Sequence, residues 1–394
     1  MTTENKRILS IDILRGFVMI VMALDHTRDF FLLGGMTTDP MNPDNTYLSL
    51  FFTRWITHLC APTFVFLSGI SAYLSSKNKD PKQAGNFLIK RGFWLLFVEI
   101  GIITLGLTFN PLYNVIILQV IWAIGWSMIL LGILSKISHR VVSVVGLILF
   151  FGHNLLNYIT LPDATTFAGR LIAATLTSSG TFIPVSETHS IGLFYVILPW
   201  TGAMFLGFSI GHWYNKEFDA TTRRKRLFYI GLALFLSFLV LRYFGWYGNP
   251  TPRKEYIEPI KTFFSFLNVS KYPPSLQYYG MTLGLTIMLL SQIENLKNRF
   301  ARLMMVYGNV PFFYYVIHFY LIHFILVIVF FASGYGTKDV VNPQIPFLFH
   351  PPNLGFNLGI VYLIWLSVIA ILYKPCIWFQ SYKATHSQWW LRYL

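Results

Sequence analysis

Long apolar stretches alternate with short polar segments along the whole chain. Most of them approach the length of about 20 residues that a helix needs to cross a bilayer core of about 30 Å. We therefore predict one all-α domain over residues 1–394, a polytopic transmembrane helix bundle. Its ten predicted helices are 9–33, 51–75, 92–110, 114–135, 140–158, 191–214, 227–248, 278–292, 304–332 and 355–380.

The composition supports a membrane protein. Hydrophobic residues make up 55% of the chain and charged residues only 12%, against about 25% charged in an ordinary soluble domain. The formal net charge of +14 would point to nucleic acid in a soluble protein. In a membrane protein, cationic loops instead set the orientation. We therefore expect contacts with membrane lipids and no nucleic-acid partner.

Lys and Arg residues are distributed unequally over the predicted loops. With a cytoplasmic N-terminus, 20 of them fall on the inner side and six on the outer side. The positive-inside rule predicts such a bias, which places both termini in the cytoplasm. The longer loops, 159–190, 249–277 and 333–354, then lie outside. The loop 249–277 mixes aromatic residues with cations, which fits an interfacial segment or an acceptor-binding loop equally well.

The first predicted helix carries several ionisable side chains, which are costly in a bilayer and indicate function by default. At 100° per residue, Asp12, Arg15 and His26 lie on one face. His26 is about 16 Å along the axis from Arg15, with Asp25 beside it. A carboxylate next to an imidazole is typical of a general base or nucleophile. The alternative interpretation is a buried ion-pair network that only orders the helices.

The second predicted helix returns from the outer side, so its first polar residues enter at the depth of His26. Arg54 and His58 are four residues apart and share a face. Pro62 predicts a kink just below them. We therefore expect both side chains to meet Asp25 and His26 in one cavity of the outer leaflet.

The ninth predicted helix adds His318 and His323, whose spacing turns them about 140° apart. They cannot share a metal ion from one helix face. Tyr314 and His318 do share a face and are candidates to line a central channel. An interhelical hydrogen bond is the simpler interpretation for each histidine alone. The chain has no Walker loop, dinucleotide fingerprint or H-E-x-x-H, so we expect no soluble-type cofactor domain and no metal.

Four segments together resemble a known family. The first, RILSIDILRGFVMIVMALDHTRDFF (7–31), looks like the opening helix of membrane acyltransferases related to heparan-α-glucosaminide N-acetyltransferase. Its Arg15-to-His26 spacing also resembles the R-x10-H signature of the wider transmembrane acyltransferases. The other segments are similar to the bacterial branch: RWITHLCAPTFVFLSG (54–69), KYPPSLQYYGMTLG (271–284) and GNVPFFYYVIHFYLIH (308–323).

The resemblance implies transfer of an acyl group, acetyl in the simplest case, from cytoplasmic acyl-CoA to a hydroxyl or amine of an outer glycan or glycolipid. His26 would be the catalytic base or acyl carrier. Arg15 would bind the donor, with Asp12 beside it. From its adjacency alone, we expect Asp25 to orient His26. Candidates for acceptor binding or support are Arg54, His58, Tyr314, His318, His323 and Lys271. The resemblance implies a location in the bacterial cytoplasmic membrane. It leaves open whether the protein forms a homo-oligomer.

The chain departs from the family pattern at one point, and two functions other than acyl transfer stay open. In members that acetylate glucosamine, the catalytic histidine is expected after the first helix. Residues 32–50 contain no His here, which favours O-acylation. A proton-coupled transporter or lipid-linked-sugar exporter would use the buried charges as a relay, although the chain lacks the repeated halves common in transporters. A haem protein would use His26 and His58 as axial ligands.

Overall fold

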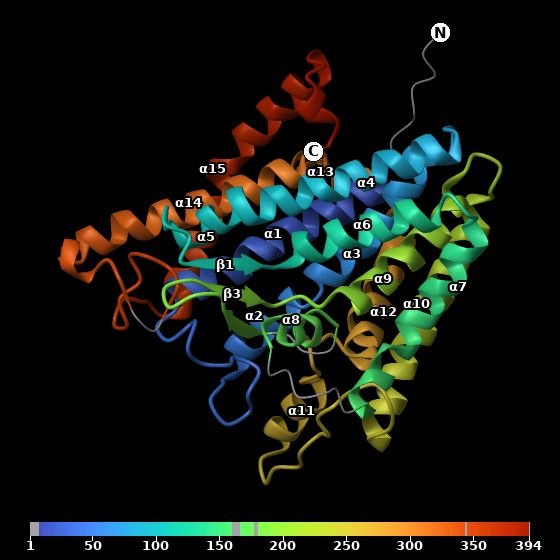
Figure 1. Ribbon diagram of the computed structural model, residues 1–394. Coiled ribbons are helices and arrows are strands. Elements are labelled where there is room, and N and C mark those ends of the chain that lie inside the picture. The colour runs from blue at the N-terminus through green and yellow to red at the C-terminus, as the bar shows by residue number, and fades with distance from the viewer. Residues whose placement is uncertain (1–7, 160–165, 177–179, 343–344, 394) are drawn as a thin grey trace.

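The computed structural model describes residues 8–159, 166–176, 180–342 and 345–393. It is mostly helical, as predicted, and α1 (Leu9–Phe31) runs through the middle of the bundle (Figure 1). The predicted cytoplasmic segment 1–7 falls outside the described residues. The helices packed around α1 are α2 (Leu48–Thr57), α3 (Cys60–Ser76), α13 (Arg299–Gly308), α14 (Pro311–Ala332) and α15 (Leu358–Thr385).

The other long helices pack in pairs beside this group. α4 (Pro81–Val98) lies against α6 (Val120–Leu134), α10 (Ala220–Phe244) against α12 (Leu276–Gln292), and α7 (His139–Gly152) against α9 (Ile197–Ile210). Polar residues accept hydrogen bonds from the first turns of six helices and so fix where they begin. These capping residues are Asp80, Ser138, Asp219, Ser275, Asn298 and Asn357.

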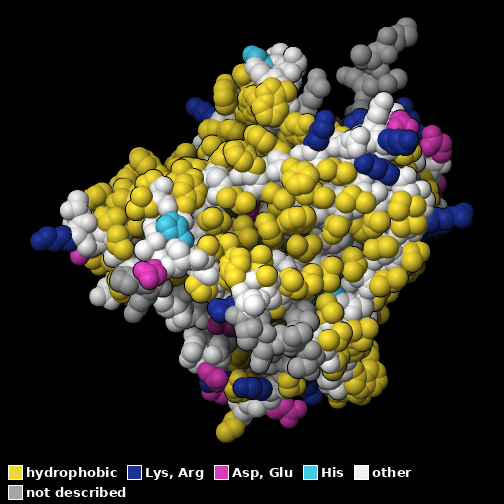
Figure 2. Space-filling model, viewed as in Figure 1, with side chains coloured by type: hydrophobic (Ala, Val, Ile, Leu, Met, Phe, Trp, Pro, Cys, Tyr) yellow, Lys and Arg dark blue, Asp and Glu magenta, His cyan; other side chains and the backbone are white. Residues whose placement is uncertain are grey.

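Five helical runs of the described residues are long and apolar enough to cross a membrane. They are Leu48–Ser76, His139–Tyr158, Ala220–Phe244, Pro311–Ala332 and Leu358–Thr385. Figure 2 shows hydrophobic side chains over most of one face, with charged side chains mainly near its edges. Helices with apolar outer faces fit a lipid surrounding. The other predicted membrane helices are shorter, interrupted or, like α1, rich in charge.

Two predicted helices begin as strands. β1 (Val115–Leu118) forms the start of predicted helix 114–135, and β3 (Ser190–Leu193) that of 191–214. These strands pair in parallel, and β2 (Thr181–Pro184) pairs antiparallel with β3, in the order β1-β3-β2. Short apolar runs fit a buried strand as well as a helix. The all-α prediction is therefore corrected to a helical bundle with a small sheet.

Two predicted helices are interrupted near a proline. Within 51–75, α2 ends before His58, because Pro62 has no N–H for the His58 carbonyl and its ring would clash with it. The Tyr278 hydroxyl donates to that carbonyl instead, at 2.9 Å. Within 304–332, α13 and α14 are separated just before Pro311. The predicted kink near Pro62 is thus a break between two helices.

The third predicted helix is continuous but changes its winding. α4 leads into a π-helical turn, Glu99–Ile103, and then into α5 (Thr104–Thr108). Two short helices, α8 (Phe167–Leu176) and α11 (Pro259–Leu267), lie between the long ones. Short 3-10 helical segments lie at His153–Tyr158, Gly211–Tyr214, Ile293–Asn295, Thr337–Asp339 and Trp389–Arg392.

The N-terminal half of α1 is held by a very close crossing with α13. A Cβ atom on Gly16 would lie 1.8 Å from the Met304 carbonyl oxygen, and one on Gly308 would lie 1.9 Å from the Asp12 carbonyl oxygen. The two backbones therefore touch, as small residues allow between membrane helices. This crossing fixes α1 at one end and positions the polar residues at its other end.

Candidate functional site

A cavity of about 470 Å³ lies along the C-terminal half of α1. One end is polar and is lined by charged residues of α1 and α2 and by nearby loops. The other end is apolar and reaches Val18 and Met19 of α1. Residues 18–30 of α1 line it, a length of about 18 Å along the helix axis. The cavity is thus long enough to bring together ligands that enter from different depths.

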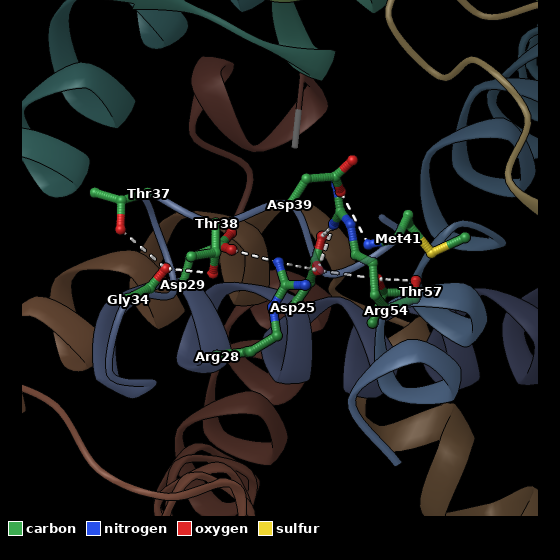
Figure 3. A network of polar contacts seen from close by, with 10 residues as sticks. All are labelled: Asp25, Arg28, Asp29, Gly34, Thr37, Thr38, Asp39, Met41, Arg54 and Thr57. Carbon is green, nitrogen blue, oxygen red and sulfur yellow. Dashed lines mark hydrogen bonds and ion pairs between the residues drawn. The ribbon is translucent and has the colours of Figure 1, made fainter. Parts of the chain in front are cut away.

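Asp25 is the centre of a buried network at the polar end (Figure 3). Its two carboxylate oxygens accept hydrogen bonds from Arg54 Nη1. Thr57 Oγ1 donates to Oδ1 at 2.9 Å, and Arg28 forms an ion pair with Asp25 at 3.1 Å and a second one with Asp29. A buried carboxylate requires such partners. The network therefore ties α1 to α2.

The structure does not place Asp25 in direct contact with His26. Among the described residues, no hydrogen bond joins the two side chains, and the Asp25 carboxylate is occupied by Arg54, Arg28 and Thr57. Neighbouring residues of a helix point about 100° apart, which explains the separation. The expected orienting role, inferred from adjacency, thus has no hydrogen bond to support it.

The His26 ring lines the cavity and packs against α14. Its centroid lies 5.3 Å from that of His318 and 4.4 Å from that of Phe319. His318 Nδ1 lies 2.5 Å from the Tyr315 carbonyl oxygen, and its Nε2 has no partner among the described residues. Tyr314 stacks on His318 with centroids 5.6 Å apart. The predicted pair Tyr314–His318 therefore lies directly behind His26.

Two other predicted histidines do not line the cavity. His58 is buried, and its ring meets the edge of Tyr278 at 5.6 Å. The nitrogens of His323 lie 2.8 and 3.0 Å from the carbonyl oxygens of Leu107 and Leu348, so this side chain joins backbone segments. Of the expected cluster, Asp25, His26 and Arg54 line the cavity and His58 does not.

Arg15 and Asp12 lie beyond the apolar end of the cavity. Arg15 donates to Asp12 Oδ1 at 3.0 Å, to Ser71 Oγ at 2.7 Å and to the Gly308 carbonyl at 3.4 Å. Met19, one helical turn further on, already lines the cavity. The predicted stripe from Arg15 to His26 therefore runs beside the apolar part of the cavity.

The N-terminal part of the chain matches a known family. The model of the heparan-alpha-glucosaminide N-acetyltransferase catalytic domain matches residues 7–242, more than half of the chain. The chain belongs to this family. No curated protein matches it. The match confirms the family resemblance and includes two of the four segments, 7–31 and 54–69. The family indicates a membrane acetyltransferase.

The N-acetyltransferase family match covers part of the cavity wall. It includes Asp25, His26 and Arg54 but ends before Lys271 and His318. The structure brings these later residues to the same region, since Lys271 lines the cavity and His318 packs on His26. The C-terminal third therefore completes a site that begins in the matched segment.

Sequence reasoning missed several residues of the cavity wall. Arg28 follows Asp25 at the same i,i+3 spacing as Arg15 follows Asp12, a signal that was visible. Thr57, three residues after Arg54, gave a weaker signal. Other wall residues come from loops and the sheet, and no local pattern connects them with α1. They are Phe182, Phe194, Tyr195, Tyr272 and Phe347.

Proposed function

We propose that this chain is a transmembrane acyltransferase that moves an acetyl group from cytoplasmic acetyl-CoA to a hydroxyl or amine of a glycan or glycolipid outside. The observation that carries the proposal is the His26 ring, which faces the cavity and has no hydrogen bond to any described residue. His26 lies within the segment matched by the N-acetyltransferase family. A histidine with an open nitrogen in a cavity is suited to proton transfer or acyl transfer.

The apolar end of the cavity fits the donor. Val18, Met19 and Met22 line it below His26, and the distance of about 16 Å from Arg15 to His26 is comparable to an extended pantetheine arm. With both termini in the cytoplasm, Arg15 lies toward the side that supplies acyl-CoA. In this arrangement Arg15, held by Asp12, attracts the phosphates, and the thioester reaches His26.

The proposed reaction needs one proton acceptor. His26 takes the proton from the acceptor hydroxyl or amine as its oxygen or nitrogen attacks the thioester carbonyl. The bond from carbonyl carbon to sulfur then breaks, and the departing CoA thiolate receives the proton from His26. The products are the acetylated acceptor and CoA. In the two-step variant, His26 first accepts the acetyl group from CoA and then passes it to the acceptor.

The surrounding residues support His26 in different ways. Phe319 and His318 confine its ring, and the bond from His318 Nδ1 to the Tyr315 carbonyl leaves Nε2 of His318 as an acceptor. Arg54 and Arg28 hold Asp25, so that the polar end keeps its shape. Arg54 is thereby a positioning residue of the acceptor side.

An assay of acetyl transfer across the membrane of liposomes tests the proposal. Acetyl-CoA carrying a labelled acetyl group is enclosed with the protein, and a glycan acceptor is supplied outside. We expect labelled acceptor from the wild type, and a loss of about 10²- to 10⁴-fold for His26→Ala, the range typical of general bases. The matched control, His386→Ala, replaces an exposed histidine of the C-terminal segment and should keep full activity.

The same preparation separates this function from its rival. A fully active His26→Ala protein of normal melting temperature would overturn the role of His26. A wild type that does not bind acetyl-CoA at millimolar concentration but carries unmodified glycan across the membrane would overturn acyl transfer and support a transporter.

A further inference from the structure

Lys271 is a buried cation without an ion pair of its own among the described residues. It follows α11, lines the polar end of the cavity and is only 9% exposed. Its ammonium has no hydrogen bond or ion pair with any described residue. The nearest ring is that of its neighbour Tyr272, whose centroid lies 5.0 Å from Nζ. Burial of an unpaired charge is costly, so an anionic ligand at this position would stabilise it.

The other charged side chains at the polar end already have partners in the protein. Arg54 and Arg28 both bind Asp25, and Arg28 also binds Asp29, as Figure 3 shows. The carboxylate of Asp39 is exposed and accepts a hydrogen bond from the Met41 N–H within its own loop at 2.9 Å. Among the described cations that line the cavity, Lys271 is therefore the one without an ion pair, and it acts on the Asp25 carboxylate only through space.

We infer that the acceptor is an anionic sugar whose carboxylate or phosphate binds Lys271. This inference rests on the proposed function, because it assigns the polar end to the acceptor. Next to Lys271, the ring of Tyr272 lies 5.5 Å from that of Tyr195 and 6.3 Å from that of Phe194. All three rings line the cavity and offer flat apolar faces for a pyranose ring. The anion then anchors the sugar while its hydroxyl or amine reaches His26.

Three matched probes test the inference by binding alone. They are the p-nitrophenyl β-glucoside, its glucuronide and its 6-phosphate, which differ only in the group at the sixth carbon. Isothermal titration calorimetry measures the binding of each probe to the purified protein. We expect at least one anionic probe to bind about 10- to 100-fold more tightly than the glucoside, the range for a charged hydrogen bond. Preference for the glucuronide indicates a sugar acid, and preference for the phosphate indicates a phosphorylated or lipid-linked sugar.

Variants of two lysines in the same region complete the test. Lys271→Met should abolish the preference for the anionic probe, and Lys271→Arg should keep most of it. Lys261→Met is the matched control, because Lys261 already pairs with Glu258 at 2.8 Å in α11, and it should change nothing. Acetyl-CoA affinity should be equal in all four proteins, since the donor phosphates lie at the other end.

These binding measurements do not depend on whether the protein catalyses acetyl transfer. Equal or absent binding of all three probes by the wild type overturns the inference, and so does a Lys271→Met protein of normal melting temperature that retains the preference. A Lys271→Met protein that loses acetyl-CoA affinity instead would show that the lysine binds the donor, which also overturns it. Failure of acetyl transfer with a preserved anion preference would contradict the proposed function alone.

Discussion

The two ends of α1 carry the same short pattern but differ in their surroundings. Asp12 and Arg15 form an ion pair at 3.0 Å near its beginning, and Asp25 and Arg28 form one at 3.1 Å near its end. The first pair lies where α1 touches the backbone of α13. The second opens on a cavity. An identical i,i+3 pair therefore occurs both beside a close helix crossing and at the wall of a cavity.

The residue after each aspartate marks the difference. Ile13, after Asp12, is 1% exposed and packs with Met304 in an apolar cluster. His26, after Asp25, faces the cavity. The ion pairs alone thus say little about function, since either can serve only to order helices. An imidazole beside a cavity distinguishes the second end.

The largest effect is expected from filling the helix crossing at the first end. Gly16→Ala places a Cβ about where the Met304 carbonyl oxygen already lies. We expect this variant not to fold, a loss well beyond the about 1–3 kcal/mol usual for an overfilled core, because neither backbone can move without displacing its helix. Yield of monodisperse protein and melting temperature measure the effect. Gly101→Ala, whose Cβ meets nothing within 4 Å, is the control. Similar values for both variants would contradict the close crossing.

A smaller effect distinguishes the two aspartates. Asp25→Asn leaves Arg54 and Arg28 without their shared carboxylate, and removal of a buried partner costs about 3–5 kcal/mol. Asp12→Asn should cost less, because Arg15 keeps the Ser71 hydroxyl and the Gly308 carbonyl. Unfolding by a denaturing detergent, followed by fluorescence, gives both values. If Asp12→Asn lowers the free energy of unfolding more than Asp25→Asn does, the ion pair at the first end contributes more to stability, which would contradict this prediction.

Much of the fold follows from local patterns of the sequence. The predicted helix 9–33 corresponds to α1, Leu9–Phe31, because apolar length and charged ends limit it. The strand Val115–Leu118 could not be predicted, since only Gln119 separates its four apolar residues from the apolar helix α6. Its pairing with β3, more than 70 residues away, is a tertiary property. Local periodicity contains no information on such partners.

The candidate site shows the same limit. The stripe of Arg15 and His26 is visible in one helix, and the charge bias brings Arg54 to the same depth. The contact between His26 and His318 depends instead on the crossing of α1 and α14. The displacement of His58 from the cavity follows from the break caused by Pro62. Helical spacing predicts faces of one element, but not which faces meet.

The two arginines should affect different substrates. Arg15→Gln should raise the KM for acetyl-CoA by about 10-fold, the loss expected for one charged hydrogen bond, with little change in the KM for the acceptor. Arg54→Gln should do the reverse, because it loosens the polar end beside Lys271. Initial rates at varied concentrations of each substrate separate the two. Equal effects on both constants from either variant would show that the ends do not serve separate ligands.

The smallest effects come from the hydroxyl groups that complete each ion pair. Thr57 donates to Asp25 at 2.9 Å, and Ser71 accepts from Arg15 at 2.7 Å. Thr57→Val and Ser71→Ala should each cost about 1 kcal/mol of stability, the usual net value of one hydrogen bond. Only Thr57 lines the cavity, so Thr57→Val should also lower acceptor kcat/KM several-fold. If Ser71→Ala lowers it equally at unchanged acetyl-CoA KM, the first end also contributes to acceptor transfer, and the two ends do not serve separate ligands.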